Sequence, residues 1–511
     1  MSASPLLAGL DIGTTNIKAV IFEPHGRPVA EASVHTPTYY PQPAWAYYKA
    51  DDLWQRTVLA LRQATLQIDN PNRIASIAVT SMGEAAVPLD AHDRPTYDVI
   101  AWFDRRTQPQ VDWLDRTIGK DRLFEITGLS LQPIFGLGKL LWFKENQPDA
   151  FARTVRWLNM ADYIAYRLCG VQATDYSLAS RTLALDLRHR RWAEDLMREV
   201  GLSPDLFAPL SVSGICLGPV LPDAALATGL PVTTQVAVGG HDHVCGALTL
   251  GVTEPGHMLN SLGTAEAIFL PLSQPITDPA MGRQGYTQGA HVVEGQYYSF
   301  GGVYTSGASI EWFKDIIGDR LDYAALISEA ELIPAGSLGV CFLPHLRQAD
   351  TPFDDPKGRG AFIGLSTDVK RGALFRAVLE GIAYQTRQSV EPLLAYAGVE
   401  RLQKVSAIGG GSRNHLLMRI KAAVLNQPIT VATVAEATSL GAAILGGLGA
   451  GVYPDVSSAL NQLHQDHTRV EPIPDEVALY DTHFRQVFQH LYLSLRSLHH
   501  TIHELQNQPD E

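Results

Sequence analysis

The segment Gly239-Gly240-His241-Asp242-His243 gathers residue types that could do chemistry. Its histidines and aspartate are residue types that bind Zn²⁺. The aspartate could instead be a general base, because a carboxylate can take a proton from a hydroxyl group within hydrogen-bond distance. An ordinary loop is the third interpretation. One His-x-His pair does not complete a zinc site, so the chemistry of this segment depends mainly on Asp242.

Two Gly-Thr turns, one in each half of the chain, connect pairs of apolar segments. Residues 8–22 read AGLDIGTTNIKAVIF, and residues 257–270 read HMLNSLGTAEAIFL. Glycine permits a positive φ and exposes backbone N–H groups, so such turns can hold a phosphate. A single Gly-Thr turn favours a structural role. The repeat, together with the aspartate of the first hairpin, predicts two related domains that bind one polyphosphate from both sides.

A third glycine cluster, IGGGSRN at residues 408–414, follows an apolar segment and precedes a helical pattern. Its backbone could approach an adenosine or a phosphate closely. A plain strand-to-helix turn with Asn414 near the helix cap is the alternative. The standard nucleotide motifs are missing: the GLGK at residues 136–139 lacks the upstream glycine and the Ser/Thr of a P-loop, and no GxGxxG follows a strand.

Apolar segments that suit strands alternate with helical patterns, which predicts an α/β fold. The strand candidates read LAGLDIG, IASIAVTSM, QVAVGG and KVSAIGGG. Helices are expected at 371–390, at 414–425 and from about 480 to 505, where apolar residues recur with helical spacing. On the last helix we expect His499, His500 and His503 to form a solvated face rather than a metal site.

Length and charge limit the function classes. The chain has 511 residues, and domains usually hold about 100–200, so two domains are expected. The net charge of −13 argues against nucleic acid and anionic membranes as partners, because both require a basic surface.

The four cysteines lack CxxC spacing and the N-terminus lacks a signal-peptide pattern, so a cytoplasmic protein is expected. The longest uncharged run, 437–454, is expected to pack inside the protein.

The order of several motifs across nearly the whole chain resembles the FGGY family of carbohydrate kinases, which belongs to the actin-like ATPases. The motifs are DIGTTNIKAV (11–20), GLGKLLWFKEN (136–146), GGHDHVCGAL (239–248), SLGTAEAIF (261–269), SGASIEWF (306–313), GRGAFIGL to LFRAVLEG (358–381) and GGGSRNHLLM (409–418). The resemblance implies an α/β protein with two ribonuclease-H-like domains, 1–250 and 251–511, around a deep catalytic cleft. It also implies ATP with Mg²⁺ and phosphorylation of a sugar or polyol hydroxyl, and it leaves a homodimer open.

The resemblance also gives roles to individual residues. Asp242 matches the general base, and Asp11 matches the carboxylate that holds Mg²⁺, an ion that usually keeps part of its water shell. Thr14 and Thr15 would bind phosphates, with Lys18 at a basic position of the family. In the second domain the matching nucleotide contacts are Gly263 and Thr264 at the γ-phosphate, with Gly307, Glu311, Gly410 and Asn414 further along the nucleotide. A solvated helix position is the alternative for Glu311.

On the sugar side, Glu84 and Trp102 match polar and aromatic substrate contacts, and His243 is a further candidate because it adjoins the base. A carboxylate binds hydroxyl groups, while an aromatic ring covers C–H groups. Glycerol kinases, which these residues resemble, also have an arginine and a tyrosine where this chain has Gly83 and Ile134. We therefore expect a larger substrate: a ketopentose, a deoxyketohexose such as L-fuculose, or a longer polyol, as in the L-fuculose-kinase-like or xylulokinase-like branch.

An actin-like ATPase that uses hydrolysis for conformational or assembly work is the second hypothesis. Such a protein would share the phosphate-binding hairpins. It would not need Glu84, Trp102 and Asp242 to face the γ-phosphate, and those residues therefore favour a sugar kinase.

Overall fold

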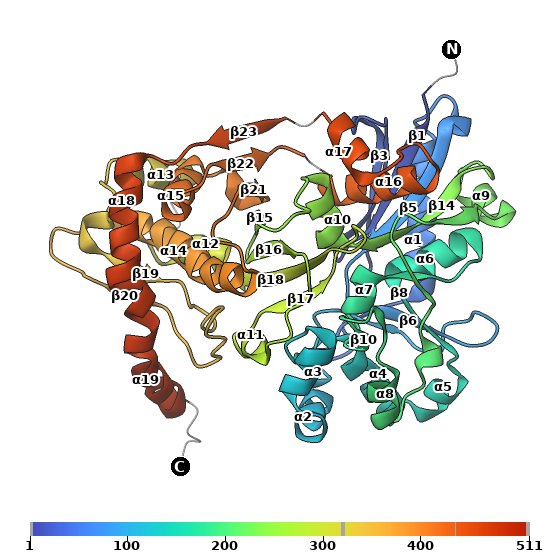
Figure 1. The fold of residues 1–511 in the computed structure, drawn as a ribbon, viewed down its shortest axis with the longest axis horizontal. Coiled ribbons are helices and arrows are strands. Elements are labelled where there is room, and N and C mark those ends of the chain that lie inside the picture. The colour runs from blue at the N-terminus through green and yellow to red at the C-terminus, as the bar shows by residue number, and fades with distance from the viewer. Residues whose placement is uncertain (1–3, 318–321, 435, 465, 507–511) are drawn as a thin grey trace.

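The computed structural model describes residues 4–317, 322–434, 436–464 and 466–506. Two lobes are visible, each built around its own sheet (Figure 1). The first sheet is formed by strands between residues 6 and 241, and the second by strands between residues 257 and 470. The sheets therefore follow one another along the chain.

The described N-terminal half contains a six-stranded sheet in the order β13-β14-β5-β1-β2-β3. Its strands are β1 (Leu6–Ile12), β2 (Asn16–Phe22), β3 (Pro28–His35), β5 (Ile74–Ser81), β13 (Cys216–Pro219) and β14 (Gln235–His241). β1, β2 and β3 are antiparallel neighbours, while β5 is parallel to β1 and β14 is parallel to β5. The carboxyl ends of β1, β5 and β14 consequently meet at one edge, where α/β proteins bind ligands.

The described C-terminal half contains a seven-stranded sheet in the order β17-β18-β16-β15-β21-β22-β23. Its strands are β15 (His257–Leu262), β16 (Glu266–Leu272), β17 (Thr287–Ala290), β18 (Tyr297–Val303), β21 (Lys404–Ile408), β22 (Ile429–Ala432) and β23 (His467–Val470). β15, β16 and β18 are antiparallel neighbours, and β21 and β22 continue parallel to β15. This order repeats that of β1, β2, β3, β5 and β14, which confirms the prediction of two related domains.

Helices cover both sheets and fill the long insertion between β5 and β14. In the N-terminal half they are α1 (Ala50–Thr65), α2 (Gln108–Thr117), α3 (Lys120–Thr127), α4 (Gly136–Asn146), α5 (Pro148–Arg153), α6 (Met160–Cys169), α7 (Tyr176–Ser180), α8 (Glu194–Glu199), α9 (Pro222–Thr228) and α10 (Asp242–Thr249). In the C-terminal half they include α11 (Pro279–Arg283), α12 (Ser306–Ile317), α13 (Tyr323–Glu331), α14 (Arg371–Ala397), α15 (His415–Leu425), α16 (Ala437–Gly449), α17 (Val456–Gln462), α18 (Pro474–His483) and α19 (Gln489–Gln506). The helices predicted from periodicity are thus confirmed, with a π-helical turn at 484–488 between α18 and α19.

The solvated face predicted for the C-terminal histidines is wrong. His499 is only 6% exposed, and its ring contacts Tyr492. His500 Nε2 lies 2.6 Å from Asp355 Oδ2, and His503 Nδ1 lies 3.0 Å from a guanidinium nitrogen of Arg359. This face of α19 packs against the segment that carries Asp355 and Arg359, and helical spacing alone does not show which face meets a distant loop.

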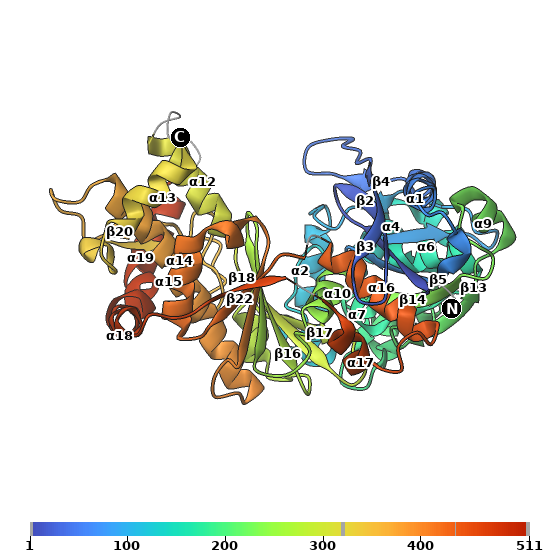
Figure 2. The ribbon, with the colours of Figure 1, turned by 90° about the horizontal axis from the view of Figure 1, so that it is seen from above.

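α16 belongs to the C-terminal half of the chain but packs on the N-terminal sheet, against β1, β5 and β14. Figures 1 and 2 both show this orange-red helix beside blue and green elements of the other lobe. Glycine permits the close approach: a Cβ on Gly9 would lie 1.8 Å from the carbonyl oxygen of Ser439, and a Cβ on Gly441 would lie 2.1 Å from that of Cys245. The predicted boundary at residue 250 separates the strands of the two sheets along the chain. α16 lies after this boundary but returns to the N-terminal sheet.

The apolar run 437–454 therefore packs inside the protein, as expected. Among the described residues, no helix combines the length and the apolar character needed to cross a membrane.

Candidate active site

Three strand ends bring the predicted general base, metal ligand and sugar-binding carboxylate to one edge of the N-terminal sheet. Asp11 lies near the end of β1, Glu84 follows β5, and Asp242 follows β14 as the first residue of α10. Thr80 of β5 is paired with Asp11 on one side and with Gly240 on the other. The parallel register therefore carries residues distant in sequence to the same level of the sheet.

A cavity of about 530 Å³ opens at this edge and is lined by both halves of the chain. Its N-terminal wall includes five predicted residues: Thr14, Glu84, Trp102, Asp242 and His243. Its C-terminal wall includes Gly263, Glu266, Phe300, Tyr304 and Thr351. Most predicted sugar-side and catalytic residues thus share one cavity.

Asp242 is bracketed by the two histidines of the GGHDH segment. The backbone N–H of His243 donates to Asp242 Oδ1 at 2.6 Å, and His243 Nδ1 lies 3.1 Å from the same oxygen. His241 Nε2 lies 3.4 Å from it. Burial alone would raise the pKa of Asp242, but His241, His243 and these hydrogen bonds hold it below its usual range. Asp242 is therefore ionised at neutral pH and able to accept a proton.

The same three residues offer metal-ligand atoms that lie within 4.8 Å of one another. Burial lowers the pKa of His241 to about 4, so this imidazole is neutral at physiological pH. Within the part of the chain that the structure describes, no fourth histidine, cysteine or carboxylate joins the group. Structural zinc sites are closed by four ligands, so the geometry favours the general-base interpretation.

Asp11 fits a cation. Its Oδ1 is buried and has no hydrogen-bond partner among the described residues. Burial and the charge of Asp242 raise the pKa of Asp11 to about 8. A divalent cation beside these two carboxylates would relieve their repulsion and satisfy the unpaired oxygen, so the residues present fit the predicted Mg²⁺.

The first hairpin carries the predicted phosphate ligands on its turn. Thr14 Oγ1 accepts a hydrogen bond from Trp102 Nε1 at 2.9 Å, and Thr15 is exposed. Lys18 Nζ lies 2.8 and 3.0 Å from the two carboxylate oxygens of Glu436. Lys18 therefore links the hairpin to the segment that precedes α16, and its role toward phosphate stays a prediction.

The second hairpin is joined to the start of α12. The N–H of Gly307 donates to the carbonyl of Gly263 at 3.2 Å, and the N–H of Ala308 donates to that of Thr264 at 3.0 Å. A Cβ on Gly307 would lie 2.4 Å from the Gly263 oxygen, so only glycine fits there. Gly263 and Thr264 remain exposed at the turn, where a phosphate could reach them.

The remaining predicted nucleotide contacts lie outside the cavity. A Cβ on Gly410 would meet no heavy atom within 4 Å, so its backbone is open to a ligand. Asn414 instead caps α15, where its Oδ1 accepts from Leu417 N at 3.0 Å. Glu311 is exposed and pairs with Lys314 at 2.8 Å. The nucleotide roles of these three residues stay predictions.

Sequence reasoning missed two buried cations that position Glu84. Lys139 of α4 donates to the carbonyl oxygens of Glu84 at 2.5 Å and Ala101 at 2.9 Å, and burial lowers its pKa to about 7. It thereby ties the segments that carry Glu84 and Trp102. Arg181 donates through Nε to Glu84 Oε1 at 2.6 Å. A lysine inside the apolar pattern of α4 was a readable signal, whereas Arg181 lies 97 residues from its partner and gave none.

Glu266 at the start of β16 forms a further buried network. Its carboxylate accepts hydrogen bonds from Lys421 Nζ (2.7 Å), Thr386 Oγ1 (2.7 Å), Asn260 Nδ2 (2.8 Å) and Ser306 Oγ (3.1 Å). The side chains of Glu266 and Lys421 are fully buried. This network connects the second hairpin to α12, α14 and α15.

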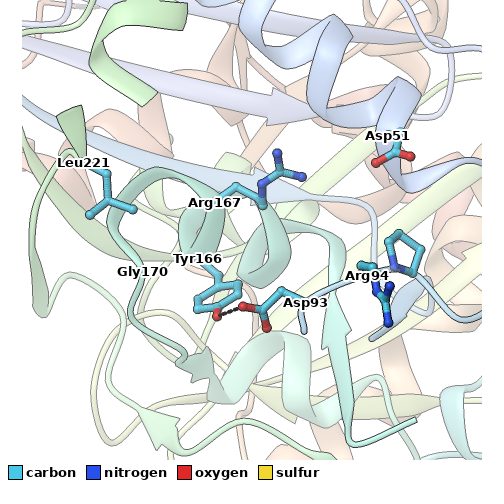
Figure 3. A pocket seen from close by; sticks show the side chains of 8 residues that line it. Asp51, Asp93, Arg94, Tyr166, Arg167, Gly170 and Leu221 are labelled. Carbon is cyan, nitrogen blue, oxygen red and sulfur yellow. Dashed lines mark hydrogen bonds between the residues drawn. The ribbon is translucent and has the colours of Figure 1, made fainter. Parts of the chain in front are cut away.

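A second hollow, of about 630 Å³, lies among α1, α6 and the turn that carries Asp93 (Figure 3). Several of its polar groups are already paired: Tyr166 Oη donates to Asp93 Oδ2 at 2.8 Å, and Arg167 donates to the hydroxyl of Tyr163 at 2.7 Å. None of the predicted site residues lines it. The cavity shared by the two halves is therefore the candidate active site.

Known proteins resemble this chain along almost its full length. The N-terminal domain model of the FGGY family of carbohydrate kinases matches residues 6–249, and its C-terminal domain model matches residues 258–450. A xylulose kinase of Bacillus subtilis is 30% identical over 492 residues, which cover 96% of this chain and 97% of that protein. A glycerol kinase of Pseudothermotoga lettingae is 30% identical over 489 residues, covering 93% and 95%. The crystal structure of a xylulose kinase from Rhodospirillum rubrum has a TM-score of 0.89 at 28% identity, covering 97% of this chain and all of that one.

The two family models divide the chain where its two sheets divide it, and the relatives match it along almost its whole length. Kinases of this kind use ATP with Mg²⁺ and transfer a phosphoryl group to an alcohol group of a carbohydrate. This chain is such an ATP-dependent kinase and belongs to the FGGY family of carbohydrate kinases.

Proposed function

We propose that this kinase phosphorylates a ketose or polyol longer than glycerol, with a ketopentose as the first candidate, and that Asp242 is its general base. The observation that carries the proposal is that Asp242, Glu84 and Trp102 line the same wall of one cavity, which the C-terminal half of the chain also lines. The similarity to xylulose kinases supports a ketopentose. L-Fuculose and longer polyols remain in the group to be tested.

The residues divide the work of binding and proton transfer. The Glu84 carboxylate accepts hydrogen bonds from sugar hydroxyl groups. The Trp102 ring, whose N–H donates a hydrogen bond to Thr14 Oγ1, covers C–H groups of the sugar. Asp242 takes the proton from the attacking hydroxyl as the phosphoryl group arrives.

The two hairpins supply hydrogen-bond donors to the phosphates through the hydroxyl groups of Thr14, Thr15 and Thr264, and Gly263 lets a phosphate approach the second turn closely. Asp11 would hold Mg²⁺, which neutralises charge on the transferring phosphoryl group when bound. Closure of the two domains on the substrates would exclude water from the cavity.

A coupled ADP-release assay tests this function. The panel comprises D-xylulose, L-xylulose, D-ribulose, L-fuculose, xylitol and glycerol, each with Mg-ATP. We expect sugar-dependent ADP release that is faster with a ketopentose than with glycerol. Asp242→Asn should lower kcat by about 10²- to 10⁴-fold and leave sugar affinity within about tenfold, because a general base acts in the transition state.

Asp195→Asn is the matched control, because Asp195 is almost fully exposed on α8 and its side chain contacts only Arg198 among described ion pairs. ATP turnover that no panel member changes would contradict the proposed function. An Asp242→Asn variant with near-normal kcat would contradict the role of Asp242.

A further inference from the structure

We propose that Arg181 is a specificity-determining positioning residue: it occupies the space left free by Gly83 and aims the Glu84 carboxylate at the sugar. The inference rests on the proposed function and adds a residue pair to it. Arg181 lies directly after α7, and both Arg181 and Glu84 line the cavity.

Arg181 holds one oxygen of Glu84 and leaves the other available. Its Nε lies 2.6 Å and its Nη2 lies 2.5 Å from Oε1. No described residue donates a hydrogen bond to Oε2. This oxygen is also not one of the fully buried side-chain atoms that lack a partner, so it is not sealed inside the protein. The side chains are 9% and 6% exposed, so the pair is largely shielded from water. A hydroxyl group that enters the cavity can therefore donate to Oε2 of a carboxylate whose orientation is already fixed.

Gly83 makes room for this arrangement. A Cβ on Gly83 would lie 3.0 Å from Arg181 Cγ and 2.9 Å from His241 Cδ2. Even alanine must displace one of these side chains, and both belong to the same cavity wall. Glu84 itself adopts a φ of +59°, a conformation that non-glycine residues rarely take, while Lys139 holds its carbonyl. Backbone, lysine and arginine together fix the position of one carboxylate.

The charges of the wall then define what it accepts. Arg181 is balanced by Glu84, and Glu266 is balanced by Lys421. His241 and His243 both lie beside the Asp242 carboxylate, at 3.4 and 3.1 Å from its Oδ1. Each basic side chain among the described lining residues is therefore paired with a carboxylate, Arg181 with Glu84 and both histidines with Asp242, so an acidic substrate would meet carboxylates and no unpaired cation. The wall therefore selects an uncharged polyhydroxy compound and rejects sugar acids.

The test compares Arg181→Met, Arg181→Lys and Gly83→Ala with the unmodified protein on the best panel sugar and on D-gluconate. We expect Arg181→Met and Gly83→Ala to raise the sugar KM at least about tenfold while the ATP KM stays within about twofold, because of the two substrates only the sugar is proposed to bind Glu84. Arg181→Lys should recover part of the loss. D-Gluconate should be turned over at least about 100-fold less efficiently than the neutral sugar, because like charges in a shielded site repel.

The double variant Arg181→Met/Glu84→Gln guards against misfolding, because it removes both charges and leaves neither unpaired. It should melt near the unmodified protein and still show the raised sugar KM. Arg198→Met, an exposed arginine on α8, is the matched control. If sugar-dependent ADP release occurs but Arg181→Met keeps the original sugar KM, the inference is overturned while the kinase function stands. Efficient gluconate turnover also overturns it, and the absence of any sugar dependence removes both proposals.

Discussion

The two hairpins that face the cavity share a backbone pattern but differ in how they treat a buried carboxylate. In the first, Asp11 Oδ1 has no hydrogen-bond partner among the described residues. In the second, Glu266 accepts hydrogen bonds from four side chains, including the fully buried Lys421. A buried acceptor without a hydrogen-bond partner lowers the stability of the fold, whereas an acceptor with several partners is held in one position.

The difference shows how one structural unit can serve two purposes. The first hairpin leaves one oxygen of its carboxylate buried and without a hydrogen-bond partner among the described residues, which costs stability and suits the Mg²⁺ that we propose there. The second uses its carboxylate to anchor the turn that carries Gly263 and Thr264 onto α12, α14 and α15. Three substitutions test this contrast, and a fourth tests the base that lies between the hairpins.

The largest effect is expected for Lys421→Met, which breaks the second hairpin's anchor. Removing one partner of a buried ion pair leaves the other charge uncompensated, so the free energy of unfolding should fall by about 3–5 kcal/mol. Urea denaturation followed by circular dichroism measures the change. Lys421→Met/Glu266→Gln should recover most of it, whereas Lys314→Met, which breaks an exposed pair, should cost less than about 1 kcal/mol. An unchanged midpoint for Lys421→Met would refute the anchoring role.

Asp11→Asn should have the opposite effect on stability and a strong effect on catalysis. The folded-state pKa of Asp11 is raised to about 8, so the folded protein binds this proton more tightly than the unfolded chain does. As the pH rises from about 4 to about 8, the free energy of unfolding of the metal-free wild type should therefore fall. The variant has no carboxylate at this position and should not show this part of the fall. We expect Asp11→Asn to melt a few degrees higher than wild type near pH 8, with little difference near pH 4.

The same Asp11→Asn variant should lose about 10²- to 10³-fold in kcat/KM, because it removes the proposed support for Mg²⁺ at the phosphates. Mg-ADP should raise the melting temperature of wild type more than that of the variant. A variant that is both less stable at pH 8 and fully active would contradict the contrast between the hairpins.

A smaller effect is expected for His243→Asn, next to the base. Burial lowers the pKa of His243, but the Asp242 carboxylate more than offsets this and raises it above its usual value. As pH falls through that pKa, His243 becomes cationic and makes Asp242 a weaker base. Wild-type kcat should therefore drop about tenfold from about pH 7.5 to about pH 5.5, while that of the variant should change less than about threefold. Parallel pH profiles would show that His243 does not tune the base.

The smallest effect is expected for Lys18→Met on the first hairpin. Its pair with Glu436 is partly exposed, and such pairs contribute only about 0.2–1 kcal/mol. The melting temperature should hardly move, and the ATP KM should rise about two- to fivefold if Lys18 also attracts phosphate. Glu436→Gln is the matched control, because it frees Lys18. An ATP KM that is equal in both variants would limit Lys18 to a structural role.

The sequence permitted prediction of the elements and their order because those signals are local. Each hairpin consists of adjacent segments around a Gly-Thr turn, and the parallel strands follow as apolar runs, so the related domains and the residues at strand ends could be inferred. Asp11, Glu84 and Asp242 meet because parallel register brings strand ends together. Their chemical roles rest on this geometry and stay to be tested.

What the sequence did not reveal depends on pairings across long separations. Periodicity identified α19 but not which face it buries, so His499 was placed in solvent although it is buried. Glycine at position 83 was visible, yet only the fold shows that Arg181 fills the space beside it. The same holds for Lys421, whose partner Glu266 lies 155 residues earlier in the chain.

The return of α16 to the first sheet has a consequence for protein synthesis. All strands of that sheet leave the ribosome before α16 does. The face of β1, β5 and β14 on which α16 packs therefore stays exposed until residue 449 has been synthesised. Domains generally fold as units in the order of their synthesis. Here the first domain cannot finish before much of the second has emerged, and a chain cut at residue 250 would expose an apolar sheet face prone to aggregation.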